Sequence, residues 1–114
     1  MSKRDVRLFL EDMLLSCQKI QRYIGTRTYK EFISDEILID GVIRNLEIIG
    51  EAVKNVPEVF KKRYPDIEWR KIAGLRDILI HEYFGVDFQI LWDIVKNKIP
   101  KLNEELQRIL NDLD

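Results

Sequence analysis

The chain has 114 residues, of which 46% are hydrophobic and 34% charged, and its formal net charge is −1. This length fits a single domain spanning residues 1–114, and the near-neutral charge excludes a protein that coats nucleic acid nonspecifically. The sequence contains no run of about 18 apolar residues, which a membrane-spanning helix would need, so no membrane partner is expected. The N-terminus has no apolar signal core and Cys17 is the single cysteine, which together favour the cytoplasm.

The first predicted element is an amphipathic helix over about residues 5–24, where apolar residues recur at spacings of three and four. Asp5 is the expected N-cap and Gly25 the expected stop. Cys17 falls on the apolar face of this helix, so it is predicted to be a small core residue rather than a reactive one.

A capping-box pattern then predicts a short helix, with Thr28 as the cap and Glu31 reaching back to it. A longer helix is expected over about residues 35–56, where apolar residues form a wide stripe. Gly41 and Gly50 interrupt this stripe at helical spacing. Glycine is costly inside a helix, so these two positions indicate that another backbone comes close, in tight helix packing within the chain or across a dimer.

The second half of the chain also has helical periodicity. Pro57 suits the first turn of a short helix, a further helix is expected over about residues 67–83, and Gly85 should end it. Asp87 can cap a last helix, which Pro100 should kink or split. No period-2 strand pattern occurs. The predicted fold is all-α, an up-and-down antiparallel bundle of four to five helices.

The helix predicted over residues 67–83 carries the chain's single histidine, His81, on a polar stripe. On a helical wheel Arg70, Gly74, Asp77 and His81 share this stripe, and Arg76 lies off its edge. Five residues separate Arg76 from His81, about 7.5 Å along the helix axis. Their side-chain tips could therefore converge on one group of the size of a phosphate.

Such a pair has the groups that RNA cleavage needs. A neutral imidazole can take a proton from a 2′-hydroxyl or, once protonated, give one to a leaving oxygen. The guanidinium of Arg76 can hold the phosphate, and Asp77 could orient the ring of His81. From the spacing alone, an ordinary histidine on a helix surface is the favoured interpretation. One histidine and one distant cysteine predict no metal site, and no cofactor is expected.

Two glutamates, Glu47 and Glu51, lie four residues apart on one face of the helix predicted over residues 35–56. They could act as acid and base, or they could hold Arg76 in place. The alternative is a solvated helix face with no special role.

Basic residues cluster from the short helix predicted at Pro57 into the helix predicted over residues 67–83. Residues 61–76 hold six basic and two acidic side chains, a local balance of +4. A basic surface of this kind can hold a polyanion. Lys62, Arg63 and Arg70 are the expected RNA-binding residues of this segment.

Three sequence blocks resemble a known family. The segment "RDILIHEY" fits the R-x4-H-x-Y signature of the HEPN superfamily, and its context resembles the HepT-like branch. The opening "SKRDVRLFLEDML" and the blocks "VIRNLEIIGEAVKNVPE" and "WRKIAGLRDILIHEYFGVD" extend this resemblance over nearly the whole chain. Asp77 departs from the pattern, because many relatives have asparagine there, and this puts its orienting role in doubt.

The resemblance implies a small helical homodimer in which two R-x4-H motifs face one another across a cleft. HepT-like proteins are metal-independent ribonucleases and are the toxins of type VII toxin–antitoxin modules. Their partner MntA, a minimal nucleotidyltransferase, inactivates the toxin by AMPylating the tyrosine of the motif. By resemblance, Arg76 and His81 would be catalytic and Tyr83 the modification site, with RNA as substrate. Assembly with the antitoxin into a larger hetero-oligomer is a further expectation.

The wheel places Tyr83 nearer the buried stripe than His81, so its modification requires a local change. We expect the helix to end or loosen near Glu82, helped by Gly85, so that Tyr83 reaches solvent. An AMP group there would add bulk and negative charge two residues from His81 and would repel an RNA phosphate.

Two rival functions remain open at this stage. The chain could be a non-catalytic helical module that binds a nucleotide or a nucleotidyltransferase partner, with Arg76 as an anion clamp. It could also be a dimerising scaffold that has no site.

Overall fold

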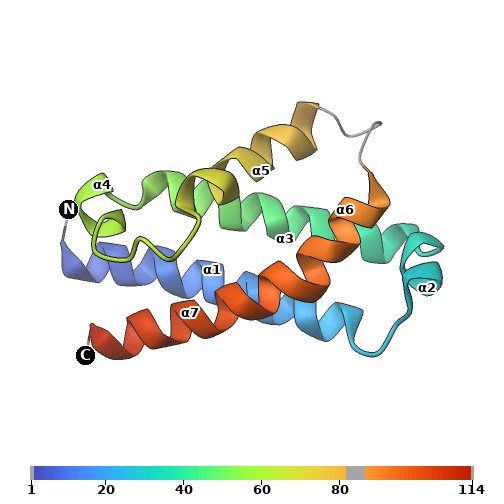
Figure 1. The fold of residues 1–114 in the computed structure, drawn as a ribbon, viewed down its shortest axis with the longest axis horizontal. Helices are drawn as coiled ribbons and strands as arrows, with labels where there is room; N and C mark the ends of the chain where they lie inside the picture. The colour runs from blue at the N-terminus through green and yellow to red at the C-terminus, as the bar shows by residue number, and fades with distance from the viewer. Residues whose placement is uncertain (1, 82–86, 114) are drawn as a thin grey trace.

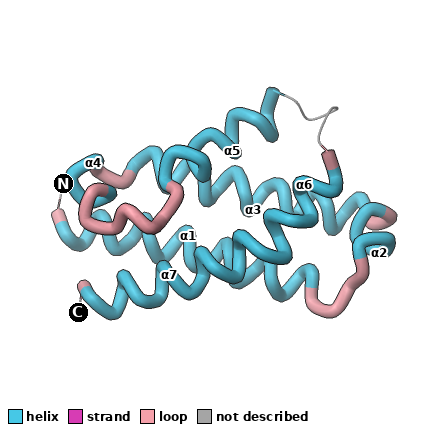
Figure 2. The backbone as a smooth tube through the Cα atoms, in the orientation of Figure 1, coloured by secondary structure: helices cyan, strands magenta, loops and turns pink. Residues whose placement is uncertain are grey.

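The computed structural model describes residues 2–81 and 87–113, without the side chains of residues 3 and 76–81. Within these residues the secondary structure is entirely helical, as predicted, and no strand is present (Figure 2). The segments outnumber the predicted four to five because two short helices are separate and the last helix is interrupted. The elements are α1 (Lys3–Ile24), α2 (Tyr29–Ile33), α3 (Glu36–Asn55), α4 (Glu58–Lys61), α5 (Trp69–His81), α6 (Phe88–Asp93), the π-helical segment η2 (Ile94–Lys98) and α7 (Ile99–Asp112).

The long helices pack as neighbours in a bundle. Helices α1 and α3 run antiparallel, side by side, along the length of the molecule (Figure 1). Helix α7 packs along α1, and α5 packs on α3. Both chain ends lie at the α4 end of the bundle, and α5 runs away from that end (Figure 1). The consequence for the site is that α5 is held mainly by α3.

Helix α1 begins earlier than predicted, because Ser2 and not Asp5 is its N-cap. The hydroxyl of Ser2 accepts a hydrogen bond from the Asp5 amide at 3.2 Å, and the Asp5 carboxylate accepts one from the Ser2 amide at 3.4 Å. This reciprocal arrangement is a capping box, so Asp5 lies within the first turn. The predicted stop is confirmed: Gly25 ends the helix with a φ of 49°.

The capping box of α2 is confirmed, with Thr28 and Glu31 bonded to each other's amides. Helix α3 is one residue shorter at each end than predicted, and the Asp35 side chain caps it. Gly41 packs against another helix of the same chain, but the contact is with a side chain. The nearest neighbour of a Cβ built there would be the ring of Tyr23 on α1, at 3.6 Å, and not a backbone. An alanine would therefore make ordinary contact at this position.

The connection between α3 and α5 contains two prolines and a short helix. Pro57 is the N-cap of α4 rather than a residue of its first turn. The indole nitrogen of Trp69 donates to the Tyr64 carbonyl at 2.9 Å, which anchors the start of α5 two residues later than predicted. The predicted end of this helix near Glu82, with Gly85 as its stop, lies outside the described residues.

The last helical segment is split near Pro100, as predicted. Asp87 caps α6, accepting from the amides of Gln89 and Ile90 at 2.8 and 3.3 Å. The chain then turns more widely through η2, where the Ile99 amide donates to the Ile94 carbonyl. Pro100 follows at the second residue of α7, where its missing N–H breaks the regular ladder.

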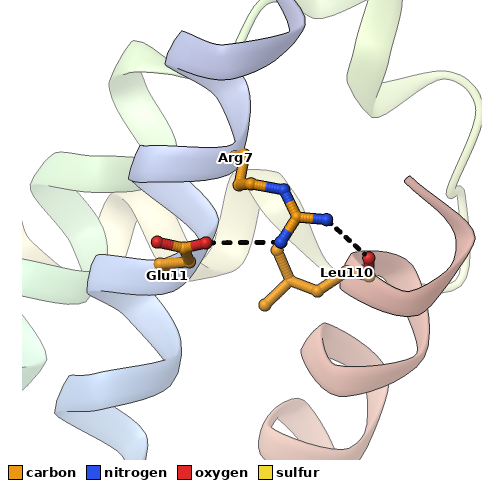
Figure 3. Close-up of polar contacts among 3 residues, drawn as sticks. All are labelled: Arg7, Glu11 and Leu110. Carbon is orange, nitrogen blue, oxygen red and sulfur yellow. Dashed lines mark hydrogen bonds and ion pairs between the residues drawn. The ribbon is translucent and has the colours of Figure 1, made fainter. Parts of the chain in front are cut away.

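A single apolar core joins α1, α3 and α7, and polar contacts tie the helix ends together. One nitrogen of the Arg7 guanidinium donates to the Leu110 carbonyl at 3.0 Å, and the other lies 3.3 Å from the Glu11 carboxylate (Figure 3). The carbonyl of Leu110 lies in the last turn of α7, where carbonyl groups have no amide partner within their own helix. The fully buried large side chains are Phe32, Leu10, Met13, Ile20, Leu46, Ile49, Leu91, Leu106, Val42, Val53 and Cys17.

Candidate functional site

Helix α5 carries the backbone of the proposed catalytic motif. Arg76, Asp77 and His81 all lie within its continuous helical stretch, Trp69–His81. Arg76 and His81 are therefore about 7.5 Å apart along one axis, as the sequence predicted. Their side chains lie outside the described part of the structure, and so does the whole of Tyr83. The convergence of Arg76 and His81 and the exposure of Tyr83 thus stay predictions.

The polar stripe of α5 is open at its centre. A Cβ built on Gly74 would meet no atom within 4 Å, leaving aside its own helix backbone. Arg70, one turn earlier on the same stripe, is exposed. The gap that Gly74 leaves in this stripe is therefore not filled by packing from the described residues.

Two of the three predicted RNA-binding residues come together, and the third does not. Lys62, just after α4, and Arg70, in the first turn of α5, line one groove of about 630 Å³. Arg63 points to a different region, since it lines cavities with Tyr64 and Asp112 near the end of α7. Neighbours in sequence diverge here because the chain turns between α4 and Pro65. All three side chains are exposed.

The glutamate pair of α3 lies on the solvent side of that helix. Glu47 is half-buried and Glu51 is exposed, one helical turn further along. The described residues do not test whether either carboxylate contacts Arg76. The proposed roles in catalysis or in positioning Arg76 therefore remain predictions.

A small apolar cavity separates α5 from the last helical segment, and no local sequence pattern signals it. Its volume is about 250 Å³, and its walls include Leu46 of α3, Leu75 of α5 and Leu102 of α7. Leu75 directly precedes Arg76, so one wall of this cavity adjoins the first residue of the motif.

Charged residues also line this cavity and form ion pairs with one another. Glu68 pairs with Lys71 at 2.8 Å and with Lys98 of η2 at 3.8 Å. The hydrogen bond from Lys71 and the positive charges of Lys71 and Lys98 lower the pKa of Glu68 below its ordinary value. The pair with Lys98 links the start of α5 to a segment 30 residues away, a contact that no local sequence pattern signals.

Cys17 is a core residue, as predicted. It is fully buried, and burial raises the pKa of its thiol to about 12. The thiol therefore stays protonated near neutral pH and is a poor nucleophile or metal ligand. This removes Cys17 from the chemistry of the site.

The described residues contain no group of three or more histidine, cysteine, aspartate or glutamate side chains placed to hold a metal ion. Among the helices in the described ranges, none combines the length and apolar character needed to cross a membrane.

Comparison with known proteins yields a consistent set of relatives. The family model described as "Ribonuclease HepT-like" matches residues 13–109. A protein of Methanocaldococcus jannaschii named as a candidate RNase is 46% identical over 114 residues, which is all of this chain and 94% of that protein.

Two further relatives show how this unit occurs elsewhere. A protein of Thermococcus cleftensis named as a candidate ribonuclease HepT is 42% identical over 107 residues, which is 94% of this chain and 97% of the relative. A second M. jannaschii protein, named for a gamma-glutamylcyclotransferase and a candidate RNase, is 45% identical over 112 residues. That match spans 98% of this chain but only 50% of the relative. No solved structure matches this chain significantly.

Proposed function

Because the chain belongs to the HepT-like ribonuclease family, we propose that it is a metal-independent endoribonuclease whose catalytic residues are Arg76 and His81. The observation that carries the proposal is the family match over residues 13–109, which includes the helix α5 that holds both residues. The apolar cavity and the basic groove beside α5 agree with a site on that helix, although neither is specific to RNA.

In the proposed reaction the substrate supplies its own nucleophile. The 2′-oxygen of a ribose attacks the adjacent phosphorus while a neutral His81 imidazole takes the hydroxyl proton. The bond to the 5′-oxygen of the next nucleotide breaks, and that oxygen takes a proton from an imidazolium. The products are a 2′,3′-cyclic phosphate and a 5′-hydroxyl. The Arg76 guanidinium holds the phosphate and stabilises charge on its non-bridging oxygens.

The need for one base and one acid supports the proposed homodimer. Each chain has one histidine. Two motifs facing one another across a two-fold axis would place one imidazole as the base and the other as the acid. Asp77 would orient the ring of His81, and Glu47 or Glu51 would hold Arg76 in position.

The same reasoning extends to regulation. We propose that the protein is the toxin of a type VII module and that an MntA-like minimal nucleotidyltransferase inactivates it by AMPylating Tyr83. The added phosphate would bring negative charge and bulk within two residues of His81 and exclude the RNA phosphate. Support comes from the family membership, which includes a relative with HepT in its name.

The central test is RNA cleavage by wild type, His81→Ala, Arg76→Ala and Arg76→Lys in the presence of EDTA. Removal of His81 should lower the rate by about 10²–10⁴-fold, and removal of Arg76 by about 10²–10³-fold. Arg76→Lys should recover only part of the activity, because lysine lacks the bidentate fork. Arg108→Ala, at an exposed arginine of α7, is the matched control and should keep full activity.

The chemistry of the cut distinguishes the proposal from its rivals. The product should carry a 2′,3′-cyclic phosphate, and a substrate with a 2′-deoxyribose at the cleavage position should resist cleavage. If His81→Ala and wild type cleave equally, the activity does not come from this site. The non-catalytic binding module would then be the better description.

Modification is tested separately. Co-expression with an MntA-like minimal nucleotidyltransferase should relieve growth arrest and add the mass of AMP to the peptide that contains Tyr83. Tyr83→Phe should remain unmodified at this peptide and should stay toxic in the presence of the antitoxin. An unchanged mass with full neutralisation would contradict regulation by AMPylation.

A further inference from the structure

A groove between α4 and the start of α5 has the charge expected of a phosphate-binding surface. Its lining holds four basic side chains, Lys61, Lys62, Arg70 and Lys71, and two acidic ones. The net charge of the lining is therefore +2, whereas the whole chain carries −1. A positive groove on a nearly neutral protein directs a polyanion to one place.

The two acidic side chains of the groove are already engaged by lysines. Glu58 lies 3.3 Å from the amine of Lys61, and Glu68 lies 2.8 Å from the amine of Lys71. The net positive charge therefore resides on Lys62 and Arg70, and both are exposed. These two cations come from different helices, one from the end of α4 and one from the first turn of α5.

An open position on α5 lies between this groove and the motif. Arg70, Gly74 and His81 occupy wheel positions on the same stripe of α5, and the space over Gly74 is empty to 4 Å. Glycine inside a helix lowers its stability relative to alanine. The described residues offer no packing reason for this glycine, and a bare helix backbone lets a ligand approach closely.

We propose that the RNA strand runs from the Arg76–His81 motif along α5, over the open position at Gly74, into this groove, where Lys62 and Arg70 bind a backbone phosphate. The inference rests on the proposed ribonuclease function. Arg70 lies eleven residues before His81, about 16 Å along the helix, which corresponds to about five stacked nucleotides. The site therefore holds the substrate several nucleotides from the cleaved bond and favours RNA of that length or longer.

The first test measures the binding of single-stranded RNA in the His81→Ala background, so that the probe stays intact. Lys62→Glu/Arg70→Glu is compared with Lys30→Glu/Arg108→Glu, which makes the same change in net charge at exposed positions elsewhere. The groove variant should bind a ten-nucleotide RNA at least tenfold more weakly. The slope of log K against log salt should fall by about 0.7, the value for one lost phosphate contact on a single strand.

Probe length makes the test specific to the path. A three-nucleotide RNA is too short to reach from the motif to the groove, so its affinity should change much less than that of the ten-nucleotide RNA. Equal losses in the groove variant and in the control would overturn the inference. If wild type cleaves RNA as proposed and only these binding results fail, then the path is wrong and the ribonuclease proposal stands.

The second test uses Gly74. An added side chain there should not lower the stability of the fold, but it should weaken RNA binding. Gly74→Ala should raise the melting temperature by about 4 °C, because the added methyl group meets no atom and helix propensity improves. Gly74→Leu should remain folded and should weaken the binding of the ten-nucleotide RNA at least tenfold. Unchanged RNA affinity in Gly74→Leu would show that the strand does not pass over this position.

Discussion

At the scale of single residues, Glu105 is a carboxylate whose environment works against its charge. Burial of its side chain beside the apolar cavity raises its pKa, and the positive charges of Lys101 and Arg108 only partly oppose this. The folded state therefore binds a proton at Glu105 more readily than the unfolded state does. It follows that the ionised form of Glu105 costs stability above its folded pKa, and that this cost disappears as the pH falls.

Glu105→Gln is accordingly expected to stabilise the protein at neutral pH. The amide keeps the shape of the side chain and removes the charge that burial disfavours. Thermal unfolding should show a higher melting temperature for the variant at pH 7, and the gain should shrink as the pH falls towards about 4, the ordinary range of glutamate.

Glu104→Gln, at the adjacent exposed position, is the matched control and should have little effect at either pH. If the gain from Glu105→Gln is independent of pH, then the charge of Glu105 is not its cause.

At the scale of helices, local sequence signals fix most of the boundaries. The caps at Thr28, Asp35 and Asp87 each follow from a side chain that can bond a nearby amide. The first cap was misassigned because Ser2 and Asp5 are both capping residues, and only their reciprocal bonds decide between the two. Contacts within a helix or one turn are thus readable from sequence.

Contacts between distant elements are not readable in this way. The five-residue spacing of Arg76 and His81 is local, so their shared helix was predictable. The meeting of Lys62 with Arg70, and the separation of Arg63 from both, depends on how the chain turns between α4 and α5. The apolar cavity depends on the packing of three helices that are far apart in sequence.

The cap of α6 provides a test of one helix start. Asp87→Ala removes the acceptor for the amides of Gln89 and Ile90 and should cost about 1 kcal/mol of unfolding free energy. Asp87→Asn can still accept these bonds, so it should cost only a few tenths of that amount. Chemical denaturation of both variants measures the difference. Equal losses would mean that the charge of Asp87, and not its capping bonds, supports α6.

At the scale of the whole molecule, the outer side of the α1–α3 pair carries exposed apolar side chains. Leu8 and Leu15 on α1 are 49% and 51% exposed, and Ile48 on α3 is 37% exposed. Tyr23 lies opposite Gly41 in this antiparallel pair, which places Leu15 and Ile48 at nearly the same level. Two helices of about 30 Å present roughly 600 Å² there, close to the 800 Å² that each partner buries in a stable interface.

We therefore expect another copy of the chain to cover this surface, in a contact separate from the one in which two α5 motifs face each other. Leu15→Glu should lower the molecular mass in solution, measured by light scattering during gel filtration, to that of a smaller assembly. Val59→Glu places the same charge at a more exposed apolar residue on α4, outside this surface, and should leave the mass unchanged. An assembly whose mass survives Leu15→Glu would have to use another face.

The π-helical turn of η2 constrains how this chain can change in length. A π turn holds one residue more than an α turn, so deleting one residue from Ile94–Lys98 would restore a regular α-helix. Because the deleted residue is the extra one of that turn, α6 and α7 would keep nearly the same rotational register. Leu91 would therefore stay on the buried side of α6. A single-residue deletion in η2 should be tolerated better than one in the regular part of α7, which would rotate the flanking segments by about 100° relative to each other.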